Sequence, residues 1–479
     1  MPNRRNIFGD VSVGPLLDER GPERRSSSYA VMPSGPMSLF TKLLRELLHR
    51  PAHRAGAAPG LSKERMAERE PGCDERLRDA HALMRAGRAT EAAAQYRQIL
   101  SAEPANLEAL NGFGVASLHL EDFSAAESAL RAALAVSPDN PLIQGNLAVT
   151  LLRLQRLCDA EEFARSALGR DEKSAEAHFV LAQCLEQRGL FDDADRHYAE
   201  CSRLDTAFAV CSNVRFSDSF FTLIEERGPY SPELPAYPMA LADSGSFDYV
   251  VLISCDATYF ERYGGSFINA FAQHAASRAL LHVHFISRDD ALVGRLQKLA
   301  DRLGLRALQC SLAALPAGLN DAARSAYYAS ARYIYMKHWL ERYGKPIACF
   351  DIDALPRSPL APLVAAAQDA DLGLVLRNGL YSPWTQIIGH TLVANPSGRA
   401  ADYFETVARY LGHFFLDAKA LWWLDQIALY CVLRHFDARG QAPRVVQIND
   451  AAVDAAWQIT KTLGEKQDDA LYAQYWLPV

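Results

Sequence analysis

The sequence predicts an α/β plus all-α protein, in which a solenoid of paired helices precedes a domain built on a mainly parallel sheet. Three observations support this prediction. Residues 73–206 repeat with a period of 34, and short apolar runs then alternate with helical segments from about residue 247. One of these runs ends at an acidic pair, Asp351 and Asp353. Because a repeat array offers surfaces rather than chemistry, any reaction is expected in the later segment.

The repeats are marked by small residues at fixed spacing. One series is Ala80, Gly114, Ala148 and Ala182, and a second is Ala92, Ala126, Ala160 and Ala194, each with steps of 34 residues. This is the period of a stacked helix-turn-helix unit. Gly87 and Gly189 mark turns inside the first and fourth units, and Pro104 and Pro138 mark unit ends. The pattern resembles the tetratricopeptide repeat family. That resemblance implies a superhelix with a concave binding surface. The array would bind a protein partner or an acceptor, pair two subunits in a homodimer, or only brace the neighbouring domain.

The remaining segments flank these two parts. Residues 1–70 are rich in Arg, Ser, Pro and Gly and are expected to be largely disordered, apart from an amphipathic helix over 38–50. That helix would rest on a membrane surface, on a partner or on the protein's own repeats. Residues 207–246 are expected to form a connection that ends in a proline-rich, semi-rigid linker. The sheet domain is assigned to 247–450, and a tail, 451–479, is expected to pack on it.

Composition excludes several classes of protein. The formal net charge is -7, which argues against a general nucleic-acid binder. No run of 18 or more apolar residues occurs, so no membrane span is expected. The N-terminus lacks the apolar stretch of a secretory signal, and the nine cysteines include no Cys-x-x-Cys pair. A cytoplasmic location is therefore the expectation.

The sheet domain carries its candidate chemistry at the end of a strand. Tyr249–Ser254, Leu280–Ser287 and Ile347–Ile352 are apolar runs too short for helices, and they predict buried strands. Such sheets bind ligands beyond the carboxyl ends of their strands. Alternation along an extended chain places the carboxylates of Asp351 and Asp353 on one side. They repel each other unless a cation lies between them, and Mg²⁺ or Mn²⁺ takes one or two carboxylates together with phosphate oxygens.

Several segments in this order resemble the nucleotide-sugar glycosyltransferases of the GT-A fold over residues 247–450. They are the strand that ends at Asp256, the helix that carries Arg332, the Asp-x-Asp pair and the late segment Trp422–Leu429. The resemblance implies a nucleotide-sugar donor, with a uridine diphosphate (UDP) sugar as the expected one. It also implies the roles of single residues on the donor side. Asp256 and Tyr259 would lie near the base, Arg332 would reach the donor, and Asp351 and Asp353 would bind the metal that bridges the diphosphate.

The same resemblance suggests acceptor-side residues. Asp425 is the candidate base, with Gln426 able to hydrogen-bond sugar hydroxyls, and the alternative is that Asp425 only caps its helix. Trp422 and Trp423 would form a platform for a sugar face or belong to the core. Gln386, Gly389 and His390 lie where an acceptor-side strand is expected, with a core histidine as the alternative for His390.

Near the C-terminus, Lys461 would bring a positive charge to the phosphates. The third metal ligand stays open between water and Asp450, because no histidine follows His435.

The predicted reaction is metal-dependent transfer of a sugar to a protein or saccharide acceptor. A bound cation would stabilise the charge that develops on the departing diphosphate. The alternative from another class is a tetratricopeptide scaffold or adaptor whose GT-A-like domain is inactive. A nucleotidyltransferase is a third possibility, but Cys255–Thr258 lacks the glycine-rich basic loop expected after its first strand.

Overall fold

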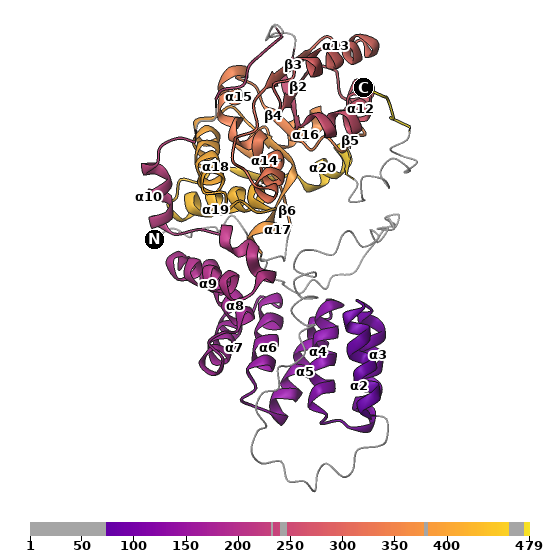
Figure 1. Cartoon of the computed structure of the whole chain (residues 1–479), viewed down its shortest axis with the longest axis vertical. Coiled ribbons are helices and arrows are strands. Elements are labelled where there is room, and N and C mark those ends of the chain that lie inside the picture. The colour runs from indigo at the N-terminus through magenta and orange to yellow at the C-terminus, as the bar shows by residue number, and fades with distance from the viewer. Residues whose placement is uncertain (1–72, 231–232, 240–246, 378–381, 459–473) are drawn as a thin grey trace, which may run out of the picture.

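The computed structural model describes residues 73–230, 233–239, 247–377, 382–458 and 474–479. A helical array forms one end of the molecule and a mixed sheet with its covering helices forms the other (Figure 1). The predicted fold class, all-α array plus α/β domain, is confirmed. The predictions for residues 1–70, including the helix over 38–50, and for Lys461 lie outside the described residues.

Four pairs of antiparallel helices make up the array. They are α2 Cys73–Arg85 with α3 Ala89–Ala102, α4 Leu107–His119 with α5 Phe123–Val136, α6 Pro141–Arg153 with α7 Leu157–Arg170, and α8 Ala175–Gln187 with α9 Phe191–Leu204. The small residues of the repeat let neighbouring helices approach closely. A Cβ atom on Gly114, for example, would come within 2.7 Å of Cγ of Leu130. The small residues that recur every 34 positions therefore lie where neighbouring helices approach closely.

The turns inside the repeats need a left-handed residue. Gly87 and Gly189 adopt φ of 74°, which glycine reaches without steric cost. Glu121 and Gln155 occupy the same turn in the two middle units and adopt φ of 60°. A left-handed conformation is unfavourable for residues with a Cβ atom. The repeat geometry thus determines these turns even where glycine is missing.

The segment after the array is more than a spacer. It forms the 3₁₀ helix η2 (Thr206–Asn213) and the helix α10 (Asp218–Glu226). The side chain of Asp195 on α9 accepts hydrogen bonds from the backbone nitrogens of Phe216, at 2.7 Å, and Ser217, at 3.0 Å. Further on, Ala236 forms a β-bridge with Leu312. The connection that the sequence predicts as a semi-rigid linker packs on both parts of the molecule.

The main sheet has seven strands in the order β3-β2-β1-β4-β7-β6-β8. Their bounds are β1 Tyr249–Cys255, β2 Ala279–Phe285, β3 Leu308–Leu312, β4 Ile347–Phe350, β6 Leu372–Leu376, β7 Ile387–Ala394 and β8 Val445–Gln447. Strands β3, β2, β1 and β4 are parallel, and β7 is antiparallel to both of its neighbours, β4 and β6. A separate antiparallel pair joins β5 (Ala354–Pro356) to β9 (Ala456–Gln458).

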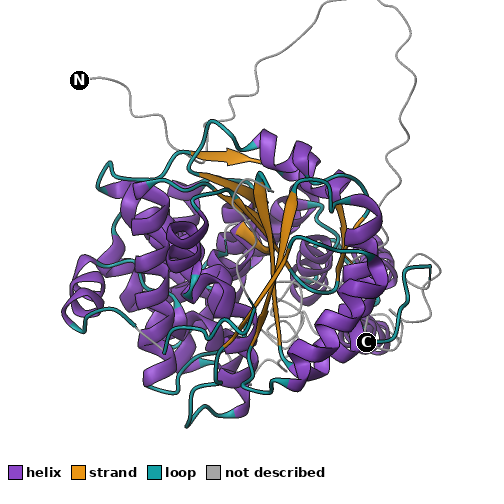
Figure 2. Ribbon diagram, turned by 90° about the horizontal axis from the view of Figure 1, so that it is seen from above, coloured by secondary structure: helices purple, strands orange, loops and turns teal. Residues whose placement is uncertain are grey.

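Helices cover both faces of the main sheet (Figure 2). Their bounds are α11 Ala257–Tyr259, η4 Phe260–Gly264, α12 Gly265–His274, α13 Ala291–Leu303, α14 Asp321–Ile334, α15 Met336–Tyr343, α16 Ala361–Ala366, α17 Pro383–Gln386, α18 Gly398–Leu416, α19 Leu424–Ala438 and α20 Asn449–Ala455. Alternate residues of β1 enter different cores. Val251 and Ile253 pack in the core with α12 and α13, whereas Val250 and Leu252 face α14, α18 and α19. The second of these cores continues into the array.

The array and the sheet domain share a buried polar contact. Glu186 on α8 is fully buried, and its Oε1 atom accepts hydrogen bonds from Tyr430, at 2.5 Å, and Arg434, at 3.0 Å, both on α19. Its Oε2 accepts one from Tyr198 on α9 at 3.0 Å. Arg434 also donates to the backbone oxygen of Glu186 at 3.0 Å. Every oxygen of the carboxylate therefore has a protein donor, which fixes α8 against α19.

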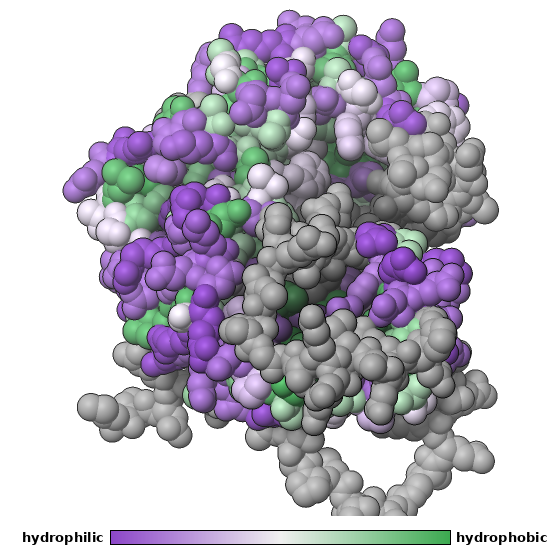
Figure 3. Space-filling model, turned by 60° about the horizontal axis from the view of Figure 1, so that its bottom comes forward, coloured by the Kyte–Doolittle hydropathy of each residue, from purple (hydrophilic) through white to green (hydrophobic). Residues whose placement is uncertain are grey.

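The outer surface is mostly hydrophilic, with small scattered groups of hydrophobic residues on the face shown in Figure 3. Leu142 on α6 and Leu416 at the end of α18 are among the exposed large apolar side chains. Among the described helices, none is both long and apolar enough to cross a bilayer.

Candidate active site

The sheet topology predicts a ligand-binding crevice beyond the carboxyl ends of β1 and β4. From β1 the chain continues to β2 and β3 on one side, and it then returns to form β4 on the other side of β1. In open α/β sheets the ligand lies beyond the carboxyl ends of the strands where the order reverses in this way. Asp256 directly follows β1, and Asp351 directly follows β4. The strand order therefore brings together two segments about a hundred residues apart that the sequence had singled out.

On the β1 side, Asp256 shapes the loop that follows the strand. Its Oδ1 atom accepts a hydrogen bond from the backbone nitrogen of Tyr259 at 2.8 Å, which starts α11. Tyr259 is 43% exposed, so its ring is available to a ligand. Burial of part of the ring raises the pKa of Tyr259, and the charges of Asp353, Asp256 and Asp351 raise it further. The two sides of the crevice are thus close enough to interact electrostatically.

On the β4 side, the two predicted metal ligands flank a core residue. Ile352 is 3% exposed and packs in the core beneath α12, whereas Asp351 and Asp353 are half-buried. The backbone nitrogen of Asp351 donates to the carbonyl oxygen of His390 on β7 at 3.1 Å. The backbone nitrogen of Ala354 donates to the carbonyl oxygen of Asp351 at 3.0 Å. These bonds fix the turn that carries both carboxylates.

Arg332 lies behind Asp351 instead of reaching out of the crevice. Its side chain is 4% exposed and forms an ion pair with Asp351, whose own side chain keeps 29% of its surface exposed. A second guanidinium nitrogen of Arg332 donates to the carbonyl oxygen of Gly389 at 2.9 Å. The resemblance implied that Arg332 reaches the donor. The observed contacts assign it a supporting role, which the sequence did not predict: it orients Asp351 and neutralises part of its charge.

The cation predicted at Asp351 and Asp353 stays a prediction. Among the described residues, no group of three or more His, Cys, Asp or Glu side chains could enclose a metal ion. Mg²⁺ and Mn²⁺ are typically bound by one or two carboxylates, with phosphate oxygens and waters completing the shell. The sequence predicts this arrangement at Asp351 and Asp353. Asp450 is exposed at the start of α20, and its role as a third ligand stays a prediction.

Asp425 lies inside the protein on the other side of Arg332. It is 7% exposed in the first turn of α19, and burial raises its pKa, while the charge of Arg332 opposes that shift. Gly389 leaves room for it, because a Cβ atom there would lie 3.0 Å from Oδ2 of Asp425 and 3.4 Å from Cγ of Gln426. Asp425 and Gln426 are therefore next to the start of β7, where the sequence predicted an acceptor-side strand.

The tryptophans that precede α19 differ from each other. Trp422 is 54% exposed, whereas Trp423 is half-buried and packs against the main core. Trp423 also adopts φ of 78°, a conformation that is rare and strained for an aromatic residue. Only Trp422 is placed to offer a platform to a ligand.

His390 and Gln386 border the crevice at β7. The Nδ1 atom of His390 is 2.8 Å from Oγ1 of Thr391, and burial lowers the pKa of His390 to about 4, so the imidazole is neutral at pH 7. Gln386 is largely buried at the end of α17. The sequence analysis missed Arg377, which directly follows β6 at the same edge. A charged residue immediately after the apolar run Leu372–Leu376 was the available signal.

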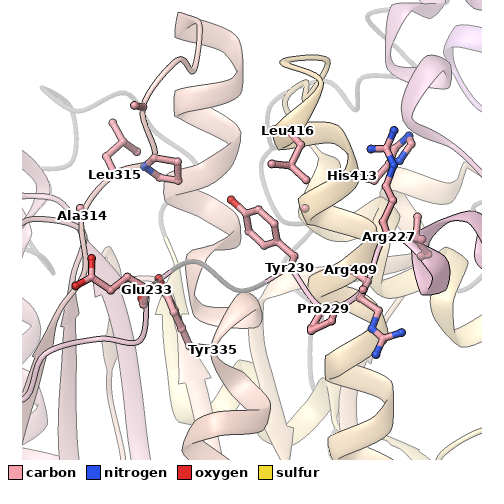
Figure 4. Close-up of a pocket in the computed structure, with 15 residues that line it drawn as sticks. Arg227, Pro229, Tyr230, Glu233, Ala314, Leu315, Tyr335, Arg409, His413 and Leu416 are labelled. Atoms are coloured by element: carbon pink, nitrogen blue, oxygen red, sulfur yellow. Dashed lines mark hydrogen bonds between the residues drawn. The ribbon is translucent and has the colours of Figure 1, made fainter.

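A separate cavity of about 550 Å³ lies between α10, α18 and the loop before α14 (Figure 4). Arg227, Tyr230, Leu315 and His413 are among the residues that line it. None of the predicted site residues does. The crevice at β1 and β4 is therefore distinct from it.

Fold and comparisons together define a tetratricopeptide-repeat array joined to an α/β domain. Residues 77–141, 120–175 and 146–200 match the tetratricopeptide repeat family. The sequence matches no curated protein.

Among solved structures, a MamA structure is similar at 21% identity with a TM-score of 0.25, covering 28% of this chain and 77% of that one. An O-GlcNAc transferase of Thermobaculum terrenum is similar at 17% identity with a TM-score of 0.27, covering 60% of this chain and 46% of that one. This chain thus spans less than half the length of that transferase. Likenesses at this level bear on neither activity nor substrate.

Proposed function

We propose that the sheet domain is a metal-dependent glycosyltransferase of the GT-A type, and that the array recruits its protein or saccharide acceptor. The donor is a nucleotide-diphosphate sugar, with a UDP-sugar as the first choice. One observation carries the proposal: the aspartate pair lies at the point where the strand order reverses, directly beside the loop that follows β1. This is where an open α/β sheet binds nucleotides.

On the donor side, Asp351 and Asp353 would hold Mn²⁺ or Mg²⁺ against the diphosphate. When bound, the cation stabilises the negative charge of the departing nucleoside diphosphate. The ion pair with Arg332 fixes Asp351 in position, because the guanidinium is itself held by the carbonyl oxygen of Gly389. Tyr259 and the loop that Asp256 stabilises would contact the base, since the Tyr259 ring is accessible beside the crevice.

On the acceptor side, Asp425 would accept the proton of the attacking hydroxyl group. Burial raises its pKa, and a raised pKa makes a carboxylate a stronger base as long as it stays ionised. The opposing charge of Arg332 favours the ionised form. Gln426 is next to it on α19 and would hydrogen-bond the acceptor or the sugar. The exposed face of Trp422 would bind an apolar sugar face at the rim.

A second candidate is an adaptor whose sheet domain does not turn over a donor. It is supported by the ion pair of Asp351 with Arg332, which neutralises one of the two proposed ligands. The tetratricopeptide repeats favour a role in protein binding under either proposal.

Release of UDP from UDP-sugars separates the two candidates without knowledge of the acceptor. The glycosyltransferase proposal predicts slow, Mn²⁺-dependent hydrolysis of at least one UDP-sugar. Asp353→Asn should reduce that rate about a thousandfold, equivalent to ~4 kcal/mol of transition-state stabilisation. Asp301→Asn, on the exposed surface of α13, is the matched control and should leave the rate unchanged. An Asp353→Asn protein that hydrolyses the donor at the wild-type rate contradicts a metal at this site.

A further inference from the structure

We infer that Arg377, at the carboxyl end of β6, binds the diphosphate of the donor and forms an anion subsite with His390 opposite the aspartate pair. This inference rests on the proposed function, since the anion in question is the donor's own diphosphate. It adds a residue that neither the sequence analysis nor the resemblance assigned.

The crevice needs a positive side chain that can reach a ligand. Arg332 is the arginine closest to Asp351, but it is 3% exposed and its terminal nitrogens contact Asp351 and Gly389. It cannot reach a diphosphate without breaking those contacts. A nucleoside diphosphate carries more negative charge than one divalent cation between two carboxylates can balance. A second, accessible cation is therefore required on the side of the crevice away from Asp353.

The strand directions place Arg377 on that side. Because β7 is antiparallel to both β4 and β6, the strands β4 and β6 run in the same direction and end at the same edge of the sheet. Their backbones are separated by two strand spacings, roughly 10 Å. An arginine side chain that extends over β7 and a diphosphate bound at Asp351 together fill such a gap. His390 lies on β7 between them, and its carbonyl oxygen accepts a hydrogen bond from the backbone nitrogen of Asp351.

Hydrogen bonds hold the backbone at the end of β6 up to Arg377. Its nitrogen donates to the carbonyl oxygen of Gln386 at 3.0 Å. The preceding residue, Leu376, is bracketed by the side chain of Asn449, whose Oδ1 atom accepts from the Leu376 nitrogen at 2.9 Å. The Nδ2 atom of Asn449 donates to the Leu376 carbonyl oxygen at 2.6 Å. The end of β6 is therefore a rigid support for an otherwise accessible guanidinium.

The electrostatics agree with an anion site. The side chain of Arg377 is exposed, yet enough protein surrounds it that desolvation lowers its pKa. No nearby charge contributes to this shift. Within the described ranges, Arg377 has no ion pair, whereas Arg278, Arg288 and Arg295 of the same domain are each paired with a carboxylate. The charge of Arg377 also reaches the imidazole of His390. The two side chains are therefore near each other at this edge of the sheet.

Calorimetric titration of UDP in the presence of Mn²⁺ tests the inference. Arg377→Gln should weaken UDP binding at least tenfold, equivalent to about 1.4 kcal/mol. Arg377→Lys should recover part of the loss, since the charge is kept. Arg444→Gln is the matched control, because Arg444 directly precedes β8, which is parallel to β6, and so lies at the opposite edge of the sheet. It should bind UDP like the wild type.

Uridine, measured by saturation-transfer NMR, separates a phosphate contact from a general loss of structure. The Arg377→Gln protein should bind uridine as the wild type does. If it loses uridine and UDP equally, or if it binds UDP as well as the Arg444→Gln protein, Arg377 does not contact the diphosphate. Those results leave the proposed function standing. If the wild type itself fails to bind UDP with Mn²⁺, the proposed function fails first.

Discussion

Two arginine–carboxylate pairs in this molecule differ in how far their carboxylates are exposed to solvent. At the junction of array and domain, Arg434 and Glu186 have side chains that are 8% and 0% exposed, and tyrosines supply further donors to the carboxylate. At the candidate active site, Arg332 is 4% exposed, but its partner Asp351 keeps 29% of its side-chain surface exposed. The first pair is closed to any ligand. The second has one buried member and one that faces the crevice.

The difference indicates how charge is used in each place. A buried carboxylate whose oxygens all accept protein hydrogen bonds contributes to a fixed geometry, here the orientation of α8 against α19. A carboxylate that is held by a buried arginine and keeps part of its side chain exposed is the kind of group we propose for binding a cation or substrate. The same residue types therefore stabilise the fold in one region, and we propose that they take part in the reaction in the other. Four experiments test this difference.

The largest effect is expected at the closed pair. Glu186→Ala would leave Arg434 buried without its partner, which typically costs 3–5 kcal/mol of unfolding free energy. Urea unfolding measures the loss. The double variant Glu186→Met with Arg434→Met removes both charges and should be far more stable than the single variant. A single variant within about 1 kcal/mol of the wild type would show that the junction does not depend on this network.

The open pair should behave differently. Asp351→Asn keeps an oxygen for Arg332 but removes the charge that balances this buried guanidinium, so we expect it to lower the unfolding free energy by about 1–3 kcal/mol, less than Glu186→Ala. Its Mn²⁺-dependent release of UDP should fall about a hundredfold, equivalent to ~2.7 kcal/mol. Rate and urea midpoint are measured on the same preparation. A large loss of stability without a loss of rate would make Asp351 a structural residue like Glu186.

A third polar cluster is also closed to solvent, and it predicts that the stability of the protein depends on pH. His282 and His284 on β2 are fully buried, and both contact Oγ of Ser311, at 2.8 and 2.9 Å. Burial lowers the pKa of His282 and lowers that of His284 to about 3. The unfolded chain takes up protons below its own pKa of about 6.5, whereas the folded state stays neutral. The contribution of the two neutral histidines to the free energy of unfolding is therefore present above pH 6.5. It is lost as the pH falls toward the pKa values that they have in the folded state.

Urea unfolding at pH 7.5 and 5.5 measures this effect. Protonation of these two histidines in the unfolded chain should lower the free energy of unfolding by about 2.7 kcal/mol between pH 7.5 and 5.5, since each contributes ~1.4 kcal/mol over this interval. His282→Asn with His284→Asn should reduce the dependence by about that amount, and the rest should persist because burial also lowers the pKa of other histidines such as His390. An unchanged slope in that variant assigns the pH dependence to other groups.

The smallest effect is expected at Gly389. A Cβ atom there would lie 3.0 Å from Oδ2 of Asp425 and 3.3 Å from the Tyr333 hydroxyl group, so Gly389→Ala should displace Asp425 slightly. We expect a loss of about 1 kcal/mol in stability, together with a larger fractional loss of transfer than of donor hydrolysis. Gly294→Ala on α13 meets no atom within 4 Å and is the control. If Gly389→Ala and Gly294→Ala transfer the sugar at the same rate, Asp425 does not take part in the reaction.

The array was predictable because its signal is periodic. Each small residue that recurs every 34 positions is needed wherever two helices approach closely, so the helical pairs follow from the sequence alone. The strands β1, β2 and β4 were also visible as apolar runs. Strands β3, β6 and β8 were not predicted, because each has five residues or fewer and none of them ends, as the equally short β4 does, at a paired acidic motif.

The candidate site was predictable only where local sequence defines it. Asp351 and Asp353 follow a strand directly, and Asp256 follows another, so each could be placed at a strand end. The roles of Arg332 and Arg377 depend on which strands are neighbours in the sheet. That strand order cannot be predicted from any single segment of the sequence. The contact of Glu186 with Arg434 joins residues 248 positions apart. No local pattern could have revealed it.

The central claim is that the aspartate pair holds a cation against a nucleoside diphosphate. Crystals grown with Mn²⁺ and UDP, measured at the manganese absorption edge, test it directly. The account predicts one anomalous peak within about 2.0–2.3 Å of a carboxylate oxygen of Asp353, with diphosphate oxygens in the same shell. UDP bound elsewhere, or bound here with manganese absent from Asp351 and Asp353, would contradict the account.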